Sequence, residues 1–270
     1  MKRVLALVSV LALPLPLAEA GPWALGRGHY YTKASFGYMR ARTLAAPDGT
    51  SFTIPLFVRN DVYLYGTYGI SDRFDVIANV PLLRSSDLAA FGKESGFGDI
   101  QFGGQYQFAR SGSTVFGVRV LLQAPTGDET RAEGILPTGS GTWEGTAVAG
   151  VGSSFAGGKL YGYAEAGYGY RGSSLRDGVV YEAQLGWNAR SWMILAFNLR
   201  GVEPFSKAAP NVAIGSPVGV SDRVTYTAYG PTLILKLPSG LGFQFDVESA
   251  ANTRNIATGA VFRAGVSLAR

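Results

Sequence analysis

The feature of this chain that most constrains its fold is a two-residue alternation of polar and apolar side chains, which recurs along the sequence. Between Asp99 and Phe108, Asp and Gln occupy odd positions, whereas Ile, Phe and Tyr occupy even positions. The segments Leu241–Glu248 and Val179–Ala189 repeat the pattern with the opposite phase. Successive side chains of a β-strand point to opposite faces, so each segment predicts a strand with one apolar and one polar face.

Twelve segments of this kind follow one another along the chain. They cover residues 29–41, 57–68, 74–83, 98–108, 114–124, 142–155, 160–171, 179–188, 192–202, 224–236, 242–249 and 256–269. The expected connections after odd-numbered strands are long, at 42–56, 84–97, 125–141, 172–178, 203–223 and 250–255. Those after even-numbered strands are short. This arrangement is typical of an outer-membrane barrel. We therefore expect an all-β, twelve-stranded antiparallel transmembrane β-barrel with short periplasmic turns and longer external loops.

The composition leaves few other ways to place the apolar residues. They make up 47% of the chain, against 16% charged residues. Beyond residue 20, the longest uncharged stretches, 145–158 and 208–221, are rich in Gly, Ser or Pro and shorter than the about 20 apolar residues that a spanning helix needs. In hydrocarbon a sheet must pair every backbone group, which only a closed barrel does.

The first twenty residues have the organisation of a secretory signal peptide. Lys2 and Arg3 precede an apolar stretch, and Ala18-Glu19-Ala20 fits the small-x-small cleavage rule. We expect a signal peptide at 1–20 and a barrel at 21–270, located in the outer membrane of a Gram-negative bacterium. The chain has no cysteine, which excludes a disulfide scaffold and a cysteine nucleophile. Its basic residues form no run, so nucleic acid is not an expected partner.

The predicted register directs the charged side chains into the barrel. The candidate lumen-lining residues are Asp99, Gln101, Arg119, Gln123, Glu144, Glu165, Arg171, Glu182, Gln184, Arg200, Lys236, Asp246, Glu248 and Arg263, and Asp75 shares their phase. They have two interpretations: a permeation path that selects solutes by charge, or a plug of side chains paired across the lumen. We expect no cofactor and no metal site.

The opposite phase predicts an apolar outer surface. Its clearest members are Phe116, Val118, Val120, Leu122, Leu195, Phe197, Leu199, Phe262, Val266 and Leu268. Aromatic residues gather near the expected strand ends, where membrane barrels carry interfacial girdles. These are Tyr30, Phe108, Trp143, Phe155, Tyr170, Trp187, Trp192 and Tyr229. Pro81 and Pro231 fall within expected strands, which predicts that the third strand ends early and that the tenth begins late or carries a bulge.

Two features point to other chemistry. Residues 167–172 match the G-x-G-x-x-G fingerprint, but no amphipathic helix follows to receive a phosphate, so we interpret them as strand glycines. His29, the one histidine, opens the first strand. An outer-membrane lipid-hydrolysing barrel using His29 as its base is the alternative from another class. A structural barrel without transport is the third. Of these three possibilities, we expect the channel, and therefore a protein that is not an enzyme.

Several motifs together resemble a known family. Gly98-Asp99-Ile100, Pro-Thr-Gly-Asp at 125–128, Leu-Pro-Thr-Gly-Ser-Gly at 136–141 and the turn at 68–73 are similar to outer-membrane proteins assigned to the MetA pathway of phenol degradation. The resemblance covers roughly 30–270. Each Pro-Thr-Gly also predicts a β-turn on its own.

The resemblance implies a transporter-like barrel for aromatic or other small hydrophobic compounds, and it transfers no catalytic residues. We therefore expect a channel or facilitator for small solutes, gated by loops 42–56, 125–141 and 203–223. Its expected partners are outer-membrane lipids and a small-molecule solute. The oligomeric state stays open.

Overall fold

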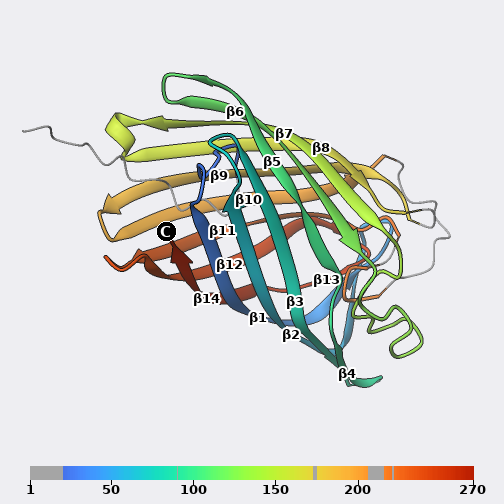
Figure 1. The fold of residues 1–270 in the computed structure, drawn as a ribbon. Coiled ribbons are helices and arrows are strands. Elements are labelled where there is room, and N and C mark those ends of the chain that lie inside the picture. The colour runs from blue at the N-terminus through green and yellow to red at the C-terminus, as the bar shows by residue number, and fades with distance from the viewer. Residues whose placement is uncertain (1–20, 90, 173–174, 206–215, 221) are drawn as a thin grey trace, which may run out of the picture.

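The strands assemble into a closed antiparallel β-barrel, seen in the computed structural model, which describes residues 21–89, 91–172, 175–205, 216–220 and 222–270 (Figure 1). Its wall consists of β1 (Tyr30–Ala45), β2 (Ser51–Gly69), β3 (Phe74–Leu88), β5 (Ile100–Ser111), β6 (Thr114–Ala124), β7 (Glu144–Phe155), β8 (Leu160–Tyr170), β9 (Gly178–Arg190), β10 (Met193–Pro204), β11 (Thr225–Lys236), β12 (Leu241–Arg254) and β14 (Val261–Ala269). Two short strands, β4 (Gly92–Gly96) and β13 (Ile256–Thr258), extend the wall by pairing with β3 and β1. The expected signal peptide, 1–20, lies outside the described residues.

The barrel closes because its first and last wall strands pair. β1 hydrogen-bonds to β2 on one side and to β14 on the other, from Tyr31 opposite Ala269 to Met39 opposite Val261. The remaining wall strands pair with their neighbours around the ring. The wall therefore has no free edge, and its backbone groups find partners within the sheet. The predicted twelve-stranded antiparallel barrel is confirmed.

Side-chain exposure follows the predicted alternation. All of the clearest members of the predicted outer surface are exposed, from 37% for Phe116 to 51% for Phe262. Charged side chains of the opposite phase are buried within the barrel, as Asp75 and Glu165 illustrate. Of the aromatic residues expected near strand ends, all but the half-buried Tyr30 are exposed. An outer surface this apolar is suited to hydrocarbon rather than to water.

The two ends of the barrel differ. The short connections 70–73, 112–113, 156–159, 191–192 and 237–240 lie at one end, which we call the turn end. The carboxyl terminus also lies there, where Arg270 pairs with Tyr30. The connections after β1, β3 and its extension β4, β6, β8, β10 and β12 lie at the other end, which we call the loop end. Among the described residues, no helix is long and apolar enough to cross a membrane.

Three of the expected long connections are wrong in extent. Residues 250–254 of the expected connection 250–255 continue β12. Most of 42–56 belongs to strands, because β1 and β2 stay paired as far as Ala45 opposite Ser51. Within 84–97, β3 continues to Leu88 and β4 folds back on it. These strands therefore project beyond the rest of the wall at the loop end, as Figure 1 shows for β4.

Of the effects predicted for the two prolines, the early end of the third strand is wrong, whereas the tenth expected strand does carry an irregularity, at a place other than Pro231. β3 runs on past Pro81, and the ladder with β2 shifts between Val62 and Tyr63 to accommodate it, because a bulge tolerates a residue that has no N–H. Pro231 lies within β11, opposite Phe197 in unbroken register with β10. The irregularity of β11 lies instead at its beginning, near Thr225.

The outward phase can be tested with two valines of equal exposure. Val118, in the middle of β6, and Val179, at the loop end of β9, are both 38% exposed. Val118→Arg places a charge at the depth of the hydrocarbon and is expected to cost about 2–4 kcal/mol, whereas Val179→Arg near the rim costs about 0–1 kcal/mol. Reversible denaturant unfolding from lipid vesicles measures both. Equal costs would contradict the assigned depth.

Candidate functional site

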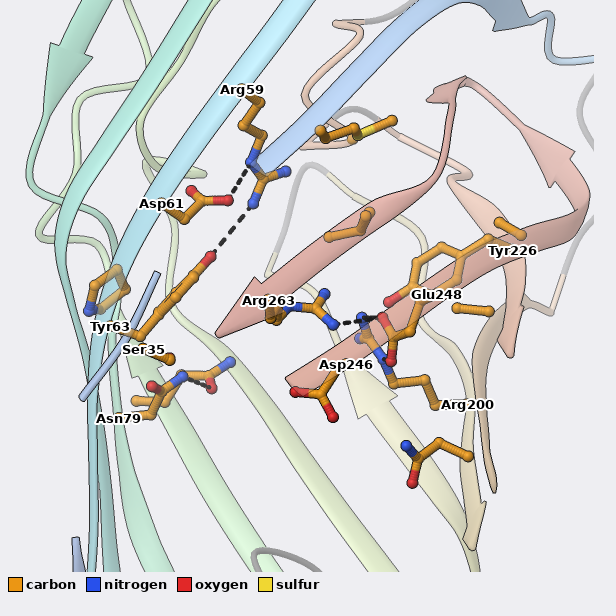
Figure 2. A pocket seen from close by; sticks show the side chains of 18 of the residues that line it. Ser35, Arg59, Asp61, Tyr63, Asn79, Arg200, Tyr226, Asp246, Glu248 and Arg263 are labelled. Carbon is orange, nitrogen blue, oxygen red and sulfur yellow. Dashed lines mark hydrogen bonds and ion pairs between the residues drawn. The ribbon is translucent and has the colours of Figure 1, made fainter. Parts of the chain in front are cut away.

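The candidate site is a cavity of about 700 Å³ enclosed by the barrel wall (Figure 2). Most of the residues predicted to line the lumen surround it. They are Asp99, Gln101, Arg119, Gln123, Glu144, Arg171, Glu182, Gln184, Arg200, Asp246, Glu248 and Arg263. Tyrosines from several strands, including Tyr63 and Tyr226, line it as well. A smaller cavity of about 220 Å³, lined by β5 to β11 and the loop-end segment at Gly219, adjoins it and shares Gln101 and Arg171.

Three predicted residues take other positions. Glu165 is buried behind the guanidinium of Arg119 rather than lining the cavity. Lys236 ends β11 at the turn end and also lies outside the cavity lining. Asp75 accepts the backbone N–H of Leu25 at 3.0 Å and so holds the segment that precedes β1.

The first group of charges in the wall is the Arg119 cluster, formed by Arg119, Glu165, Glu182 and Tyr163. Glu165 and Glu182 are direct partners in the β8–β9 ladder, an arrangement that is unfavourable for two like charges. Arg119 on β6 donates to both carboxylates, at 2.6 Å and 3.4 Å. The Tyr163 hydroxyl donates to Glu182 at 2.6 Å. The positive charge is therefore what makes the paired carboxylates tolerable.

The second group is the Arg200 cluster, formed by Arg200, Glu248, Arg263 and Tyr226. Arg200 donates from Nε and Nη2 to the two oxygens of Glu248, at 3.1 Å and 2.8 Å. Arg263 donates from Nη1 to the same carboxylate at 2.6 Å. The ring of Tyr226 lies 6.0 Å from the Arg200 guanidinium, within the range of a cation–π contact. Two arginines thus share a single glutamate.

The third group, the Asp61 cluster, was missed by sequence reasoning because the second strand has no clean polar face. Asp61 on β2 accepts Nε of Arg59 at 2.7 Å and Nε of Arg84 at 3.4 Å. Arg59 also donates to the Val218 carbonyl and Arg84 to the Thr138 carbonyl, at 3.2 Å and 3.1 Å. The cluster thereby ties two loop-end segments to the wall. The sequence feature that could have revealed this cluster is the two-residue spacing of Arg59 and Asp61, which places both side chains on one face of the strand.

Asp99 explains the doubled Pro-Thr-Gly sequence. Its carboxylate accepts the backbone N–H of Gly127 at 2.9 Å and that of Ser140 at 2.6 Å, one from each turn. The two turns touch back to back, because a Cβ at Gly139 would lie 2.7 Å from the Cα of Gly127 and 2.2 Å from an oxygen of Asp99. Glycine is required by this close approach. Asp99 therefore fixes the 125–143 connection on the rim of the cavity.

The same connection carries its own local turn. Asp128 accepts the backbone N–H of Thr130 at 2.9 Å and its hydroxyl at 2.7 Å. Both hydrogen bonds lower the pKa of the exposed Asp128 carboxyl, and the one from the Thr130 hydroxyl has the larger effect. The turn is therefore formed at neutral pH, where the carboxylate is the accepting form.

A cluster of buried apolar residues, which we call the cap, lies at the loop end. Its buried residues are Ala41, Leu44, Phe57, Leu88, Leu136, Val218 and Ala257, which come from the projecting strands and from two connections. Phe57 and Leu136 are fully buried. The Ser216 hydroxyl donates to the Ile135 carbonyl at 2.7 Å and joins the two connections to each other. Of the predicted gate 203–223, residues 206–215 and 221 lie outside the described part of the chain.

The segment before β1 enters the turn end of the barrel. Trp23 lies edge-on to Tyr161 and Tyr163, with ring centroids 6.3 Å and 6.0 Å away. Gln105 donates to the Trp23 carbonyl at 2.8 Å. A Cβ at Gly152 would lie 2.5 Å from the indole, so the wall leaves room for this ring. We call this segment, with Trp23 at its centre, the stopper. The sequence analysis did not predict it, because residues 21–28 show no alternation of polar and apolar side chains.

The alternative chemistries find no support in the described residues. The backbone of His29 pairs with Gly26 and Gly69, and its side chain makes no hydrogen bond to a serine or carboxylate within that part of the chain. No group of His, Asp and Glu there is arranged to hold a metal ion. Residues 167–170 of the G-x-G-x-x-G sequence belong to β8. Gly167 lies against the backbone of β7, so it acts as a strand glycine.

The closed wall, the apolar exterior and the polar cavity define an outer-membrane β-barrel. The chain belongs to the family described as "Putative MetA-pathway of phenol degradation", whose model matches residues 45–264. No curated protein matches the sequence.

Solved structures share the fold at low sequence identity. The COG4313 outer membrane channel from Pseudomonas putida F1 is 18% identical, with a TM-score of 0.70 over 92% of this chain and 98% of that chain. The KdgM porin is 8% identical, with a TM-score of 0.52 over 88% of this chain and 98% of that one. The CymD monoaromatic hydrocarbon channel is 9% identical, with a TM-score of 0.50 over 91% and 89%. The similar proteins are channels and porins, not enzymes.

Because the Asp99 carboxylate holds the 125–143 connection, removing this carboxylate should make the connection mobile. Asp99→Ala deletes hydrogen bonds to a charged acceptor, each worth about 1.5–3 kcal/mol. We expect trypsin to cleave after Arg131 at least about tenfold faster, since tenfold corresponds to about 1.4 kcal/mol. Asp87→Ala, at an exposed position on β3, is the control and should leave the rate unchanged. An unaltered cleavage rate in the Asp99 variant would contradict the role of Asp99 in holding the 125–143 connection.

The stopper predicts a change in conductance. Trp23→Ala removes the indole from between Tyr161 and Tyr163 and widens the turn end. We expect single-channel conductance in planar bilayers to rise at least about twofold, because the narrowest layer of a pore limits ion flow. Trp192→Ala, which removes an exposed ring, should conduct like the parent protein. The same conductance in both variants would show that Trp23 does not limit the path.

Proposed function

We propose that this protein is an outer-membrane channel that admits small hydrophobic or aromatic solutes. The observation that carries the proposal is the cavity within the barrel wall, which is lined by tyrosines and by charges that form ion pairs in the wall. Paired charges offer little net field to a simple ion, whereas the aromatic rings offer contact area to an uncharged or weakly polar solute. Membership of a family named for phenol degradation agrees with such a cargo.

The proposed orientation follows from the two ends. The turn end and its stopper face the periplasm, and the loop end with its cap faces outside, as in other outer-membrane barrels. Residues 1–20 serve as the export signal. Lipids of the outer membrane contact the exposed apolar residues, and the connections 125–143 and 216–220 form the gate, together with the strand-paired region at 42–56.

Solute entry past the cap needs movement of the two connections that build it. The carbonyls of Val218 and Thr138 are held by Arg59 and Arg84, so these hydrogen bonds must break or rearrange when the gate opens. The candidate lumen residues then act as the lining of the path. This supports the permeation interpretation at the centre of the barrel, while the stopper supports occlusion at the turn end.

A matched pair of tryptophan variants on β1 tests transport. Ser35 lines the cavity and Ala34 points outward on the same strand. Gram-negative cells expressing Ser35→Trp should take up radiolabelled phenol and toluene more slowly than cells expressing the parent protein, because the indole obstructs part of the cavity. Cells expressing Ala34→Trp should keep the uptake of the parent protein, at least about threefold above that of cells without the protein.

The folding of both variants is checked by heat-modifiable migration on gels. Uptake that is equal in the parent protein, in Ser35→Trp and in empty cells would contradict a channel and favour a structural barrel without transport. Residual lipid hydrolysis that His29→Ala abolishes would instead favour the hydrolytic alternative.

A further inference from the structure

The cavity lining sets a small apolar pair among charged side chains, with Arg59 beside Met39 and Glu248 beside Val261 in the β-ladders. Met39 and Val261, which oppose each other on β1 and β14, line the cavity beneath the cap. The next inward pair on the same strands is Gly37 and Arg263. Two residues along a strand advance by about 7 Å. An apolar surface and an arginine therefore lie within the span of one small molecule.

The arginines of the cavity differ in what their nitrogens already contact. Arg59 and Arg84 donate to Asp61 and to loop carbonyls. Among the described residues, Nη1 of Arg200 and both Nε and Nη2 of Arg263 have no hydrogen-bond acceptor. Arg200 and Arg263 are also the more accessible, with side chains 38% and 25% exposed, against 20% for Arg59. Free guanidinium donors thus face the cavity.

The carboxylates near these donors are already engaged. Glu248 accepts from both arginines. Asp246, opposite Arg263 in register, accepts from the Thr232 hydroxyl and from the Gln244 amide. Glu182, opposite Arg200, is held by the Arg119 cluster. The remaining donors of Arg200 and Arg263 are therefore open to an acceptor that does not belong to the wall.

The stretch of wall between the charged groups is open. Gly37 lies between Arg263 and Asp61, and a Cβ there would meet them only at 3.7 Å and 3.8 Å, which is ordinary contact. Figure 2 shows Arg59, Asp61 and Tyr63 on one side of this space and Arg200, Glu248 and Arg263 on the other. The ring of Tyr226 borders the second side.

We propose that the cavity binds small amphipathic carboxylates, with the carboxylate on Arg200 and Arg263 and the apolar body beneath the cap. Guanidinium groups bind carboxylates through charge-assisted, directional hydrogen bonds, and two of them meet here at Glu248. An aromatic acid such as benzoate fits this description. The inference rests on the proposed function and adds small carboxylates to the aromatic solutes that the cavity would take.

Isothermal titration of the purified full-length protein in detergent at pH 7 tests the inference with benzoate and its uncharged analogue benzyl alcohol. We expect benzoate to bind at least about tenfold more tightly than benzyl alcohol. Arg263→Gln should weaken benzoate at least about tenfold and leave benzyl alcohol unchanged, because only the carboxylate uses the charge. Arg40→Gln, at an exposed position of β1, is the control.

A second variant covers the case in which Arg263→Gln does not fold. Glu248→Gln removes the carboxylate that competes for both arginines and should strengthen benzoate binding. Equal binding of the two ligands, or benzoate binding that neither variant changes, would overturn the inference. If cells take up phenol but the purified protein binds benzoate no more tightly than benzyl alcohol, this inference alone is overturned. If the protein binds benzoate but cells take up neither phenol nor toluene, the proposed transport is overturned.

Discussion

The pairing of β1 with β14 is the constraint on which the rest of the structure depends. A sheet in hydrocarbon has no solvent to satisfy an unpaired edge, so the wall must close before its outer surface can be apolar. Closure also separates two environments by a single layer of backbone. The same strand can then expose Phe262 to lipid and direct Arg263 into a polar interior.

The arrangement of the interior charges follows from that separation, because a charge held away from bulk water needs opposite charges nearby. Arg119 neutralises paired glutamates, Glu248 joins two arginines, and Asp61 joins two more. The clusters differ in what they hold. The Asp61 cluster fixes the gate through loop carbonyls, whereas the Arg200 cluster keeps unmatched donors toward the cavity. Structural support and solute recognition are thus divided between clusters of similar composition.

The alternation was sufficient to predict the strand order, the closed barrel and the outward phase, as Phe116 and Leu268 show. It failed where polarity does not alternate. Residues 42–56 carry no clean pattern, and they pair because the projecting strands bury Leu44 and Phe57 in the cap. The stopper and the contacts of Asp99 depend on segments distant in sequence. The motif at 125–141 identified the connection, but it did not identify the Asp99 carboxylate that holds it.

Closure is tested most directly by a disulfide across the β1–β14 seam, since the chain has no cysteine of its own. Ala34 and Val266 are direct partners there, so Ala34→Cys with Val266→Cys should oxidise as readily as a reference pair at Ala164 and Ala183 on β8 and β9. A closed wall predicts a crosslink in the seam pair, which joins the first and last strands of the wall. A seam pair that stays reduced while the reference pair crosslinks would show an open sheet and contradict it.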